Sequence, residues 1–484
     1  MDYRDLLNSG EAALRAGRLG AAVRLLRAVN SARVPREFRL PLANLCRRSG
    51  QVTLGLRLLT PAIDPTRKRL GANATDPEKA EYAVLLQRSG VTQAALDLLS
   101  EIDVRLAPQA PLYRAFCFFN IWEYEQALPD LENYVAGVED PYQRLLGHVN
   151  LAAAYVNTGR NEQALALLDR HHREAKTGGY ERLRANCLEL RAEVRIHLRD
   201  FKRAAKDLEE AARILGAARV HDQLFVRKWF AVLAGHRAGD GAPIKDFQRE
   251  AIARREWESV RDADFHLLDL RFDAGLFDRL YFGTPWAGYR RRMQDVFKLA
   301  PVATHGIFGT GPCFDTETGT LDGAICLTPG ERHHQTIDVL TQDFYRPKPV
   351  GALFQALCAG EHFDVFTSPN RVHQIMRRTR RWLQSAGLPA SISCEAGGYA
   401  IRTHGRLAWR VPRDRVCSAP TREPARFARL LALVPKDKTL TRAQIGACLG
   451  VGKTSVNDLM NWATDHGHAR RQGQGRATRY RLVG

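Results

Sequence analysis

The sequence predicts a multidomain protein in which an all-α array of repeated helical hairpins is followed by two small α+β domains. Three observations support this fold class. A pair of small and large apolar residues recurs every 32 to 40 residues over positions 1–215, residues 305–416 change to strand-like alternation with glycine-marked turns, and positive charge gathers near the C-terminus. With 484 residues and 45% hydrophobic content, the chain is long enough to bury several cores.

The repeat consists of a small residue, a Leu four positions later and often a Gly five positions earlier. The small residues and their Leu partners are Ala22/Leu26, Gly55/Leu59, Ala95/Leu99, Ala127/Leu131, Ala164/Leu168 and Ala204/Leu208. Gly17, Gly50, Gly90 and Gly159 precede four of these pairs, and the copies at Ala127 and Ala204 lack the Gly. This period is typical of helical hairpins, in which the Gly ends one helix and the small residue allows the next to pack closely. We therefore predict an all-α helical-hairpin repeat solenoid over residues 1–215.

One copy of the repeat resembles a known family. The segment "LAAAYVNTGRNEQALALLD" is similar to a tetratricopeptide unit, with Tyr155, Gly159, Ala164 and Leu168 at the aromatic, turn, small and large positions. The resemblance implies a concave groove that holds a protein or peptide partner. The alternative is an array that only supports its neighbours. No residue in the array stands out as catalytic.

Residues 216–304 keep a helical pattern but lose the repeat, so they are expected to form a helical cap or linker. Within them, "LYFGTPWAGYRRRMQDVF" combines an aromatic loop broken by Gly and Pro with a short basic helix. This segment suits either a hinge between the two halves of the chain or a capping helix on the solenoid.

Residues 305–416 read as a hairpin, three short helices and further strands. "FDTETGTLDGAICLTP" predicts the hairpin, Pro347, Pro349 and Pro369 stand near helix starts, and "SISCEAGGYAIRTHGRLAWRV" alternates like paired strands. The order of elements resembles the winged helix-turn-helix effector domain of OmpR-type response regulators. The matching residues are Leu327, Thr328, Pro329, Glu331, Leu353, Leu357, the helix from Val372 to Leu383, Gly398 and Tyr399. No phospho-receiver domain precedes this segment, and His333-His334 stand where the family is usually apolar.

The helix from Arg371 to Gln384 suits the major groove of DNA. Its apolar residues recur at three- and four-residue spacing and are Val372, Ile375, Met376, Thr379, Trp382 and Leu383. Its other residues are basic or carry amides, with no acid among them, and Arg can bond guanine while Gln bonds adenine. The residues expected to bind DNA are Arg371, His373, Gln374, Arg377, Arg378 and Arg381.

The stretch "LGVGKTSVNDLM" admits two interpretations. Gly452-Lys453-Thr454 could close a phosphate-binding loop, but that motif needs a Gly where Ala447 stands and a buried strand before it. The alternative is a helix-turn-helix, in which Thr441 caps the first helix, and Gly446, Gly450 and Val456 allow the two helices to pack closely. We favour the helix-turn-helix.

The strand-like segment "HARRQGQGRATRYRLV" follows this second pattern. Together they resemble the wing and helices of bacterial winged helix-turn-helix regulators, so residues 417–484 are expected to form a second such domain. The resemblance implies that Lys453, Thr454, Ser455, Asn457 and Asn461 face DNA. It places Arg470, Arg471, Arg476 and Arg479 on the DNA backbone or in the minor groove.

The charge of the chain agrees with a nucleic-acid partner. From Phe366 to Val416 there are ten Arg against two acids, and from Thr421 to Gly484 there are twelve Lys or Arg against four, so the last 119 residues carry +16 of the net +19. Nine cysteines show no C-x-x-C pair, which suggests neither a zinc site nor a disulfide framework. No signal peptide or long apolar run is present, so we expect a cytoplasmic protein without membrane contact.

These patterns favour a sequence-specific, DNA-binding transcriptional regulator with a sensing or protein-binding repeat array. Double-stranded DNA is the expected nucleic acid, RNA polymerase is a further expected partner, and no cofactor, metal or enzymatic activity is expected. The alternative is a DNA-targeting adaptor or scaffold that recruits another activity through its repeats. Linked DNA-binding modules would raise each other's effective concentration on a long or composite site.

Overall fold

The computed structural model describes residues 2–15, 18–64, 73–216, 220–395, 397–413, 422–434, 438–473 and 478–483. The first half is a stack of helices. Its elements are α1 (Tyr3–Arg15), α2 (Leu19–Arg27), the 3-10 turn η1 (Ser31–Arg33), α3 (Arg36–Arg48), α4 (Val52–Ile63), α5 (Asp76–Ser89), α6 (Thr92–Ser100), α7 (Ala110–Asn120), α8 (Tyr124–Gly137), α9 (Pro141–Asn157), α10 (Asn161–Thr177), α11 (Glu181–His197) and α12 (Phe201–Leu215). Five more helices follow: α13 (Val220–Ala238), α14 (Ala242–Arg254), α15 (Trp257–Leu270), α16 (Ala274–Phe282) and α17 (Ala287–Phe297).

The predicted repeat residues lie where neighbouring helices meet. Ala22, Ala95, Ala127, Ala164 and Ala204 are fully buried. A side chain at Gly55 would press against Leu85 of the next hairpin, which explains why this position stays small. Every Leu of the repeat is buried as well, so the pattern marks the core of the solenoid.

The turn before each small residue has a left-handed backbone. Gly50, Gly90 and Gly159 have φ values of 76°, 92° and 74°, and Gly17 lies outside the described residues. In the two copies without Gly, Trp122 and Arg199 adopt the same conformation, with φ values of 60° and 62°. Arg255, with φ of 61°, repeats the geometry between α14 and α15. The left-handed turn therefore also forms in the copies of the repeat that lack the glycine.

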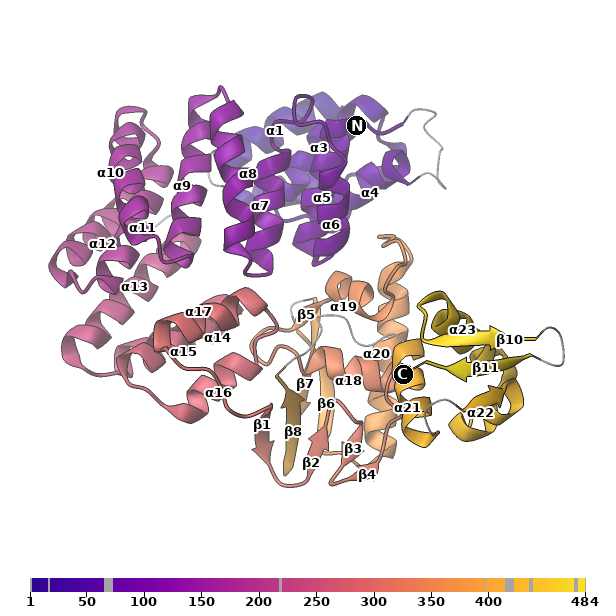
Figure 1. The fold of residues 1–484 in the computed structure, drawn as a ribbon. Coiled ribbons are helices and arrows are strands. Elements are labelled where there is room, and N and C mark those ends of the chain that lie inside the picture. The colour runs from indigo at the N-terminus through magenta and orange to yellow at the C-terminus, as the bar shows by residue number, and fades with distance from the viewer. Residues whose placement is uncertain are drawn as a thin grey trace.

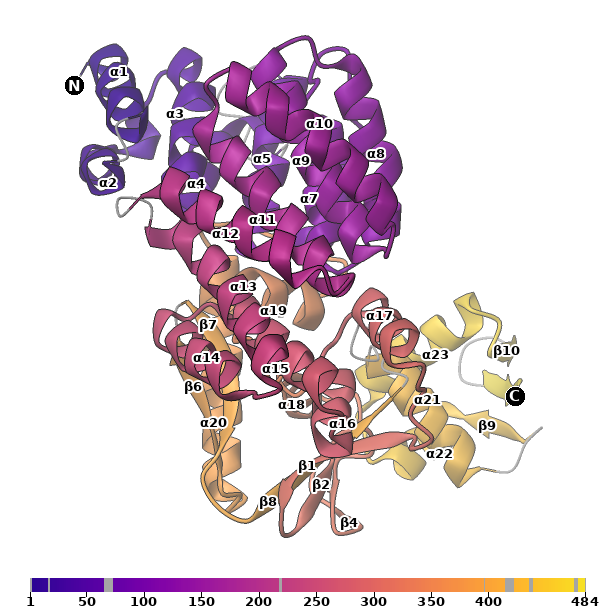
Figure 2. The ribbon, with the colours of Figure 1, turned by 90° about the vertical axis from the view of Figure 1, so that its left-hand side faces the viewer.

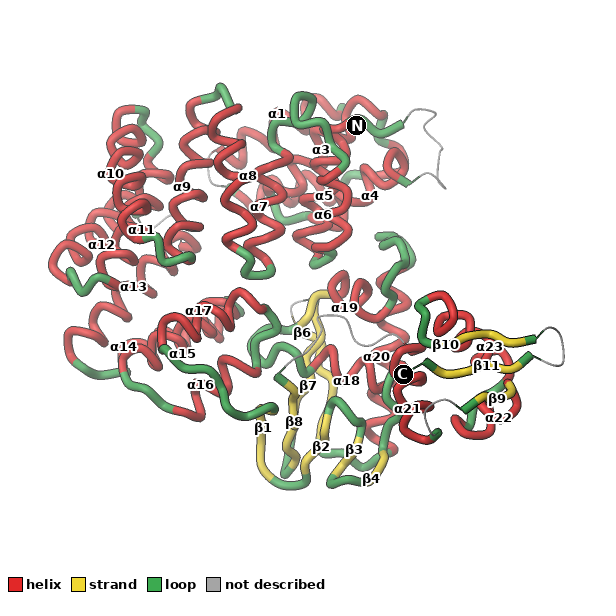
Figure 3. The backbone as a smooth tube through the Cα atoms, viewed as in Figure 1, coloured by secondary structure: helices red, strands yellow, loops and turns green. Residues whose placement is uncertain are grey.

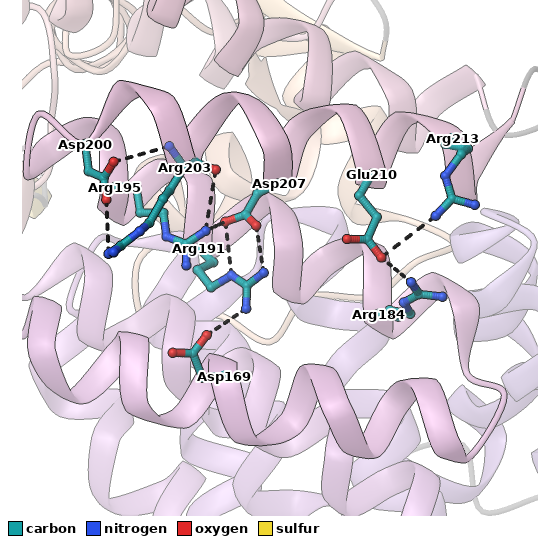
Figure 4. A network of polar contacts seen from close by, with 9 residues as sticks. All are labelled: Asp169, Arg184, Arg191, Arg195, Asp200, Arg203, Asp207, Glu210 and Arg213. Atoms are coloured by element: carbon teal, nitrogen blue, oxygen red, sulfur yellow. Dashed lines mark hydrogen bonds and ion pairs between the residues drawn. The ribbon is translucent and has the colours of Figure 1, made fainter.

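A polar network ties α10, α11 and α12 together (Figure 4). The side chain of Asp207 on α12 is 5% exposed and forms ion pairs with both Arg191 and Arg195 of α11. Arg191 also pairs with Asp169 on α10 at 2.6 Å. Because one carboxylate is shared by two guanidinium groups, the network fixes the register of three successive helices.

The C-terminal part mixes helices and strands (Figure 3). Its first section contains β1 (His305–Thr310), β2 (Cys313–Asp315), β3 (Thr320–Leu321), β4 (Ala324–Ile325), α18 (Arg332–Leu340), β5 (Lys348–Pro349), α19 (Val350–Leu357), α20 (Ser368–Ser385), β6 (Ala390–Glu395), β7 (Gly398–Thr403) and β8 (Leu407–Pro412). Its second section contains α21 (Arg422–Leu433), β9 (Thr439–Thr441), α22 (Arg442–Leu449), α23 (Lys453–Asp465), β10 (Ala469–Gln472) and β11 (Arg479–Leu482).

The strands form three sheets, with orders β1-β8-β2-β3-β4, β5-β7-β6 and β10-β11-β9. All pairs are antiparallel except β2 with β8. The segment predicted as one hairpin is three short strands, because the chain turns twice, at 316–319 and 322–323. The last predicted strand, β8, pairs with β1 and not with the β6–β7 hairpin. Residues 305–412 therefore form two of the three sheets.

The solenoid arches over the mixed part in both ribbon views, with the N-terminus in the upper half and the C-terminus in the lower half (Figures 1 and 2). One hydrophobic core runs through both. It includes Leu85 and Leu99 from the solenoid and Leu353, Phe354 and Trp409 from the mixed part. Residues 422–482 have a separate core.

Candidate nucleic-acid interface

Helix α20 is amphipathic as the sequence predicts. Pro369 stands in its first turn, where a missing N–H costs nothing. Val372, Met376, Thr379 and Leu383 are buried against the sheet and α18, and Ile375 and Trp382 pack partly against the same core. The apolar stripe therefore fixes which side of the helix faces out.

The outward face of α20 is basic. Gln374, Arg377, Arg378 and Arg381 are exposed and form no hydrogen bond or ion pair with any other described residue. Their guanidinium groups keep their N–H donors available for phosphate oxygens or base edges.

Two other predicted contacts of α20 have partners within the protein. Arg371 makes a two-pronged ion pair with Glu361, in which Nη2 lies 2.9 Å from Oε1, and the bond lowers the pKa of the Glu361 carboxyl. Both side chains are about half exposed, so a phosphate could compete for this arginine at little cost. His373 Nδ1 lies 2.7 Å from the Tyr399 hydroxyl on β7.

Arg380 has a different position from its arginine neighbours. Its Nε donates to the Ile392 carbonyl at 2.7 Å, and its guanidinium lies 5.3 Å from the Tyr399 ring centre. It therefore holds α20 against the β6–β7 hairpin. The sequence pattern counts Arg380 among the basic residues of the helix and does not reveal this anchoring role.

The two histidines that depart from the OmpR-type pattern have polar partners. His333 Nδ1 lies 3.1 Å from the Thr379 hydroxyl on α20. His334 is 2% exposed, accepts from the Gly330 N–H at 3.2 Å and lies 3.1 Å from the Glu317 carbonyl. Burial lowers the pKa of both rings, so they are neutral hydrogen-bonding residues at this position.

The second site is built by α22 and α23. Thr441 caps α22 and exchanges hydrogen bonds with Gln444, as a capping box does. A Cβ at Gly446 would lie 3.1 Å from the Val451 carbonyl and 3.5 Å from Val456, and Gly450 ends α22 with φ of 66°. The predicted small residues therefore allow the two helices to cross closely.

The phosphate-loop interpretation lacks its strand in this structure. The segment before Lys453 is helix α22, and the short strand β9 ends at Thr441, so no strand leads directly into the loop. A nucleotide-binding loop of that type needs strand, loop and helix in succession.

Helix α23 presents some of the predicted side chains and half-buries others. Lys453, Thr454 and Asn461 are exposed, whereas Ser455 is partly buried and Asn457 has a buried Oδ1 without a hydrogen-bond partner. Asp458 is also exposed, one turn from Thr454, and was not singled out from the sequence. An acid there suits a cytosine amino group but repels phosphates.

The β10–β11 hairpin carries arginines on one face. Arg470 pairs with Arg481 and Gln472 with Arg479, and residues that face each other across a ladder lie on the same side. Arg471 is opposite Tyr480, a core residue, so it lies on the other side. Arg481 lies on the same face as Arg470 because the two residues pair across the hairpin, and the sequence alone did not predict this pairing. Arg476 lies outside the described residues.

The described residues contain no group of three or more His, Cys, Asp or Glu side chains placed to hold a metal ion. Among them, no helix is long and apolar enough to cross a membrane.

The fold is that of a helical-hairpin repeat protein with a C-terminal mixed α/β part. Solved structures similar to it include the apo form of RapI, with 15% identity over 62% of this chain and 98% of RapI and a TM-score of 0.34. A Rap protein complexed with competence and sporulation factor is 12% identical over 61% of this chain and 86% of its own, with a TM-score of 0.33. No protein-family model and no curated protein matches the chain.

Proposed function

We propose that this protein is a sequence-specific, DNA-binding transcriptional regulator whose repeat region binds a protein or peptide partner. The observation that carries the proposal is the outward face of α20, where Gln374 and three arginines stand without any acid partner. A structural surface helix would normally balance such charges, and a DNA-reading helix needs them unpaired.

The order of elements from β1 to β8 supports a winged helix-turn-helix for the first section. Strands precede α18, α19 and α20 follow, and the β6–β7 hairpin packs beside α20 in the place of a wing. The hairpin itself contributes little positive charge, because Arg402 pairs with Glu395 at 2.8 Å. In this proposal α20 therefore supplies most of the contacts in the first section.

The section from α21 to β11 supports a second reader of the same type. Its helices cross at Gly446, and its hairpin presents Arg470, Arg479 and Arg481 on one face. Two readers in one chain would cover a composite DNA site without requiring a dimer. Under the adaptor alternative, the same surfaces bind DNA only through its backbone, and the repeats recruit another activity.

The test is selection of genomic DNA fragments by the full-length protein at two salt concentrations, followed by binding titrations on the selected fragment. We expect the variant with Arg377→Ala and Arg378→Ala to bind at least about 30 times more weakly, because two lost contacts at about 1–3 kcal/mol each sum to at least about 2 kcal/mol. The slope of log affinity against log salt should fall by about 1 for each phosphate contact removed.

A matched control is the variant with Arg203→Ala and Arg213→Ala, which removes the same charge from exposed positions on α12. This control should leave DNA affinity nearly unchanged. Equal affinity of the α20 variant and the wild type would remove α20 from the interface. A motif-free selection that disappears at the higher salt would favour the adaptor.

A further inference from the structure

Helix α17 is docked against the turn between α7 and α8 by direct backbone contact. A side chain at Gly288 would collide with the Trp122 carbonyl oxygen. Beside this contact, the Tyr289 and Trp122 rings meet edge to face at 4.6 Å, and Arg291 pairs with Glu123 at 2.6 Å. The helix is therefore fixed at one end by three kinds of contact.

A cavity of about 330 Å³ remains between the rest of α17, three hairpin turns of the solenoid and α15. That volume lies at the lower end of the range for small-molecule sites. Its walls include the aromatic rings of Trp122, Tyr124 and Phe265 and the polar side chains of Asn161 and His197. The cavity lies outside the proposed nucleic-acid interface.

Three charged residues of α17 line this cavity. Arg291 pairs with Glu123, and the other two, Arg292 and Asp295, have opposite signs. The Arg292 guanidinium lies 4.5 Å from the Phe265 ring centre and 5.5 Å from that of Trp122, so it packs on both rings. Asp295 follows one turn later on the same side of the helix. Neither residue forms a hydrogen bond or an ion pair with any other described residue, and they do not pair with each other.

The surroundings decide which net charge the cavity accepts. The other charged side chains of the lining have partners of opposite sign, since Glu125 pairs with Arg160 and Arg199 with Asp269. Arg292 and Asp295 therefore remain as one positive and one negative group, and Asp295 disfavours a ligand with net negative charge. Arg292 itself disfavours a cation. His197 adds no charge, because burial lowers its pKa to about 3. The buried Oδ1 of Asn161 has no hydrogen-bond partner and can accept from an N–H.

We propose that this cavity binds a free α-amino acid with an apolar side chain. The carboxylate would bond the guanidinium of Arg292, the ammonium would bond Asp295 and the Asn161 oxygen, and the side chain would pack on Phe265. A planar guanidinium held on aromatic rings is preorganised for two parallel bonds to a carboxylate. The cavity contains none of the residues proposed to bind DNA.

The test is isothermal titration of the full-length protein with each of the twenty L-amino acids, followed by two analogues of the best binder. In the N-acetyl analogue the ammonium is lost, and in the amide the carboxylate is lost. We expect both analogues to bind at least about tenfold more weakly than the free amino acid, since each loses a hydrogen bond to a charged group.

Asp295→Asn should weaken binding of the free amino acid by about tenfold and leave the N-acetyl analogue unaffected, because the exposed carboxylate contributes only to the ammonium. Arg292→Lys keeps the positive charge and removes the two-pronged bond to the ligand carboxylate. Arg213→Ala on α12 is the control, because Arg213 does not line the cavity. Binding of none of the twenty amino acids would overturn the proposal. Equal binding of the N-acetyl analogue would also overturn it and would indicate a ligand with a carboxylate alone.

Discussion

At the residue scale, one backbone position defines the solenoid. In the described copies of the repeat, the residue at the hairpin turn has positive φ, whether it is Gly90, Gly159, Trp122 or Arg199, and Arg255 repeats this conformation between α14 and α15. Only glycine adopts this conformation without steric cost, so the non-glycine copies store strain that the packing around them must offset. Single substitutions at these positions can measure the contribution of this strain to the free energy of unfolding.

We predict opposite effects for two exchanges at this position. Gly159→Ala should lower the free energy of unfolding by about 1 kcal/mol, because the turn has open space for a Cβ but φ of 74°. Arg255→Gly should raise it by about 0.5 kcal/mol, since relief of strain exceeds the added entropy of the unfolded chain. Denaturant titration monitored by circular dichroism measures both. A stabilised Gly159→Ala variant would contradict this account of the turn.

At the scale of elements, α9 and α10 meet through stacked histidines. The rings of His148 and His171 lie 3.9 Å apart and nearly parallel, and His171 Nδ1 lies 2.8 Å from Glu174. Burial lowers the pKa of His148 to about 4, with further lowering by His171, Arg170 and Arg144, whereas Glu174 acts in the opposite direction. His171 is 2% exposed and its pKa is lowered for the same first reason.

Protonation of this histidine pair should destabilise the solenoid as the pH falls. The unfolded chain takes up protons near pH 6.5, before the folded chain does, so the stability from the neutral pair is complete above 6.5 and is lost toward pH 4. We expect the melting temperature to fall over this window, and to fall less in His148→Phe, which keeps an aromatic ring but cannot titrate. Calorimetry at a series of pH values compares the two, and parallel curves would exclude the histidine pair as the cause.

At the scale of the whole molecule, the helical part holds the first mixed section through contacts on both α6 and α15. Near α5, the Gly90 turn contacts the start of α19, and the Gln93 N–H donates to Gln355 at 3.0 Å. Near α15, Arg261 makes two bonds to Asp343, at 2.8 and 2.9 Å, with both side chains at least 95% buried. The solenoid and this section therefore share one packed unit, and a change in the curvature of the arch would act on both contacts.

The Arg261–Asp343 pair should couple the unfolding of these two parts. Asp343→Ala leaves Arg261 buried with only Glu258 to pair with and should cost about 3 kcal/mol. We expect calorimetry to resolve two transitions in this variant where the wild type joins them. A double-mutant cycle with Arg261→Met separates the pair from the backbone bonds that Asp343 also accepts, and a coupling energy near zero would show that the pair does not link the parts.

The sequence by itself determined the helical hairpins, the buried face of α20 and the crossing of α22 and α23. In these places the signal is local: apolar residues at helical spacing, Thr441 as a cap, and small residues such as Gly446 where two helices adjacent in sequence must touch. The same reasoning identified basic residues on α20, and their roles in DNA binding remain predictions.

Only the tertiary structure decided which polar groups find partners across the fold. Glu361 pairs with Arg371, and Asp343 pairs with Arg261. Tyr399 forms a hydrogen bond with His373, and its ring contacts the guanidinium of Arg380. It also decided that Trp122 and Arg199 adopt the turn conformation of a glycine, and that α17 encloses a cavity with the hairpin turns. Contacts between residues far apart in the chain depend on how whole elements pack, and no local pattern of side chains encodes that arrangement.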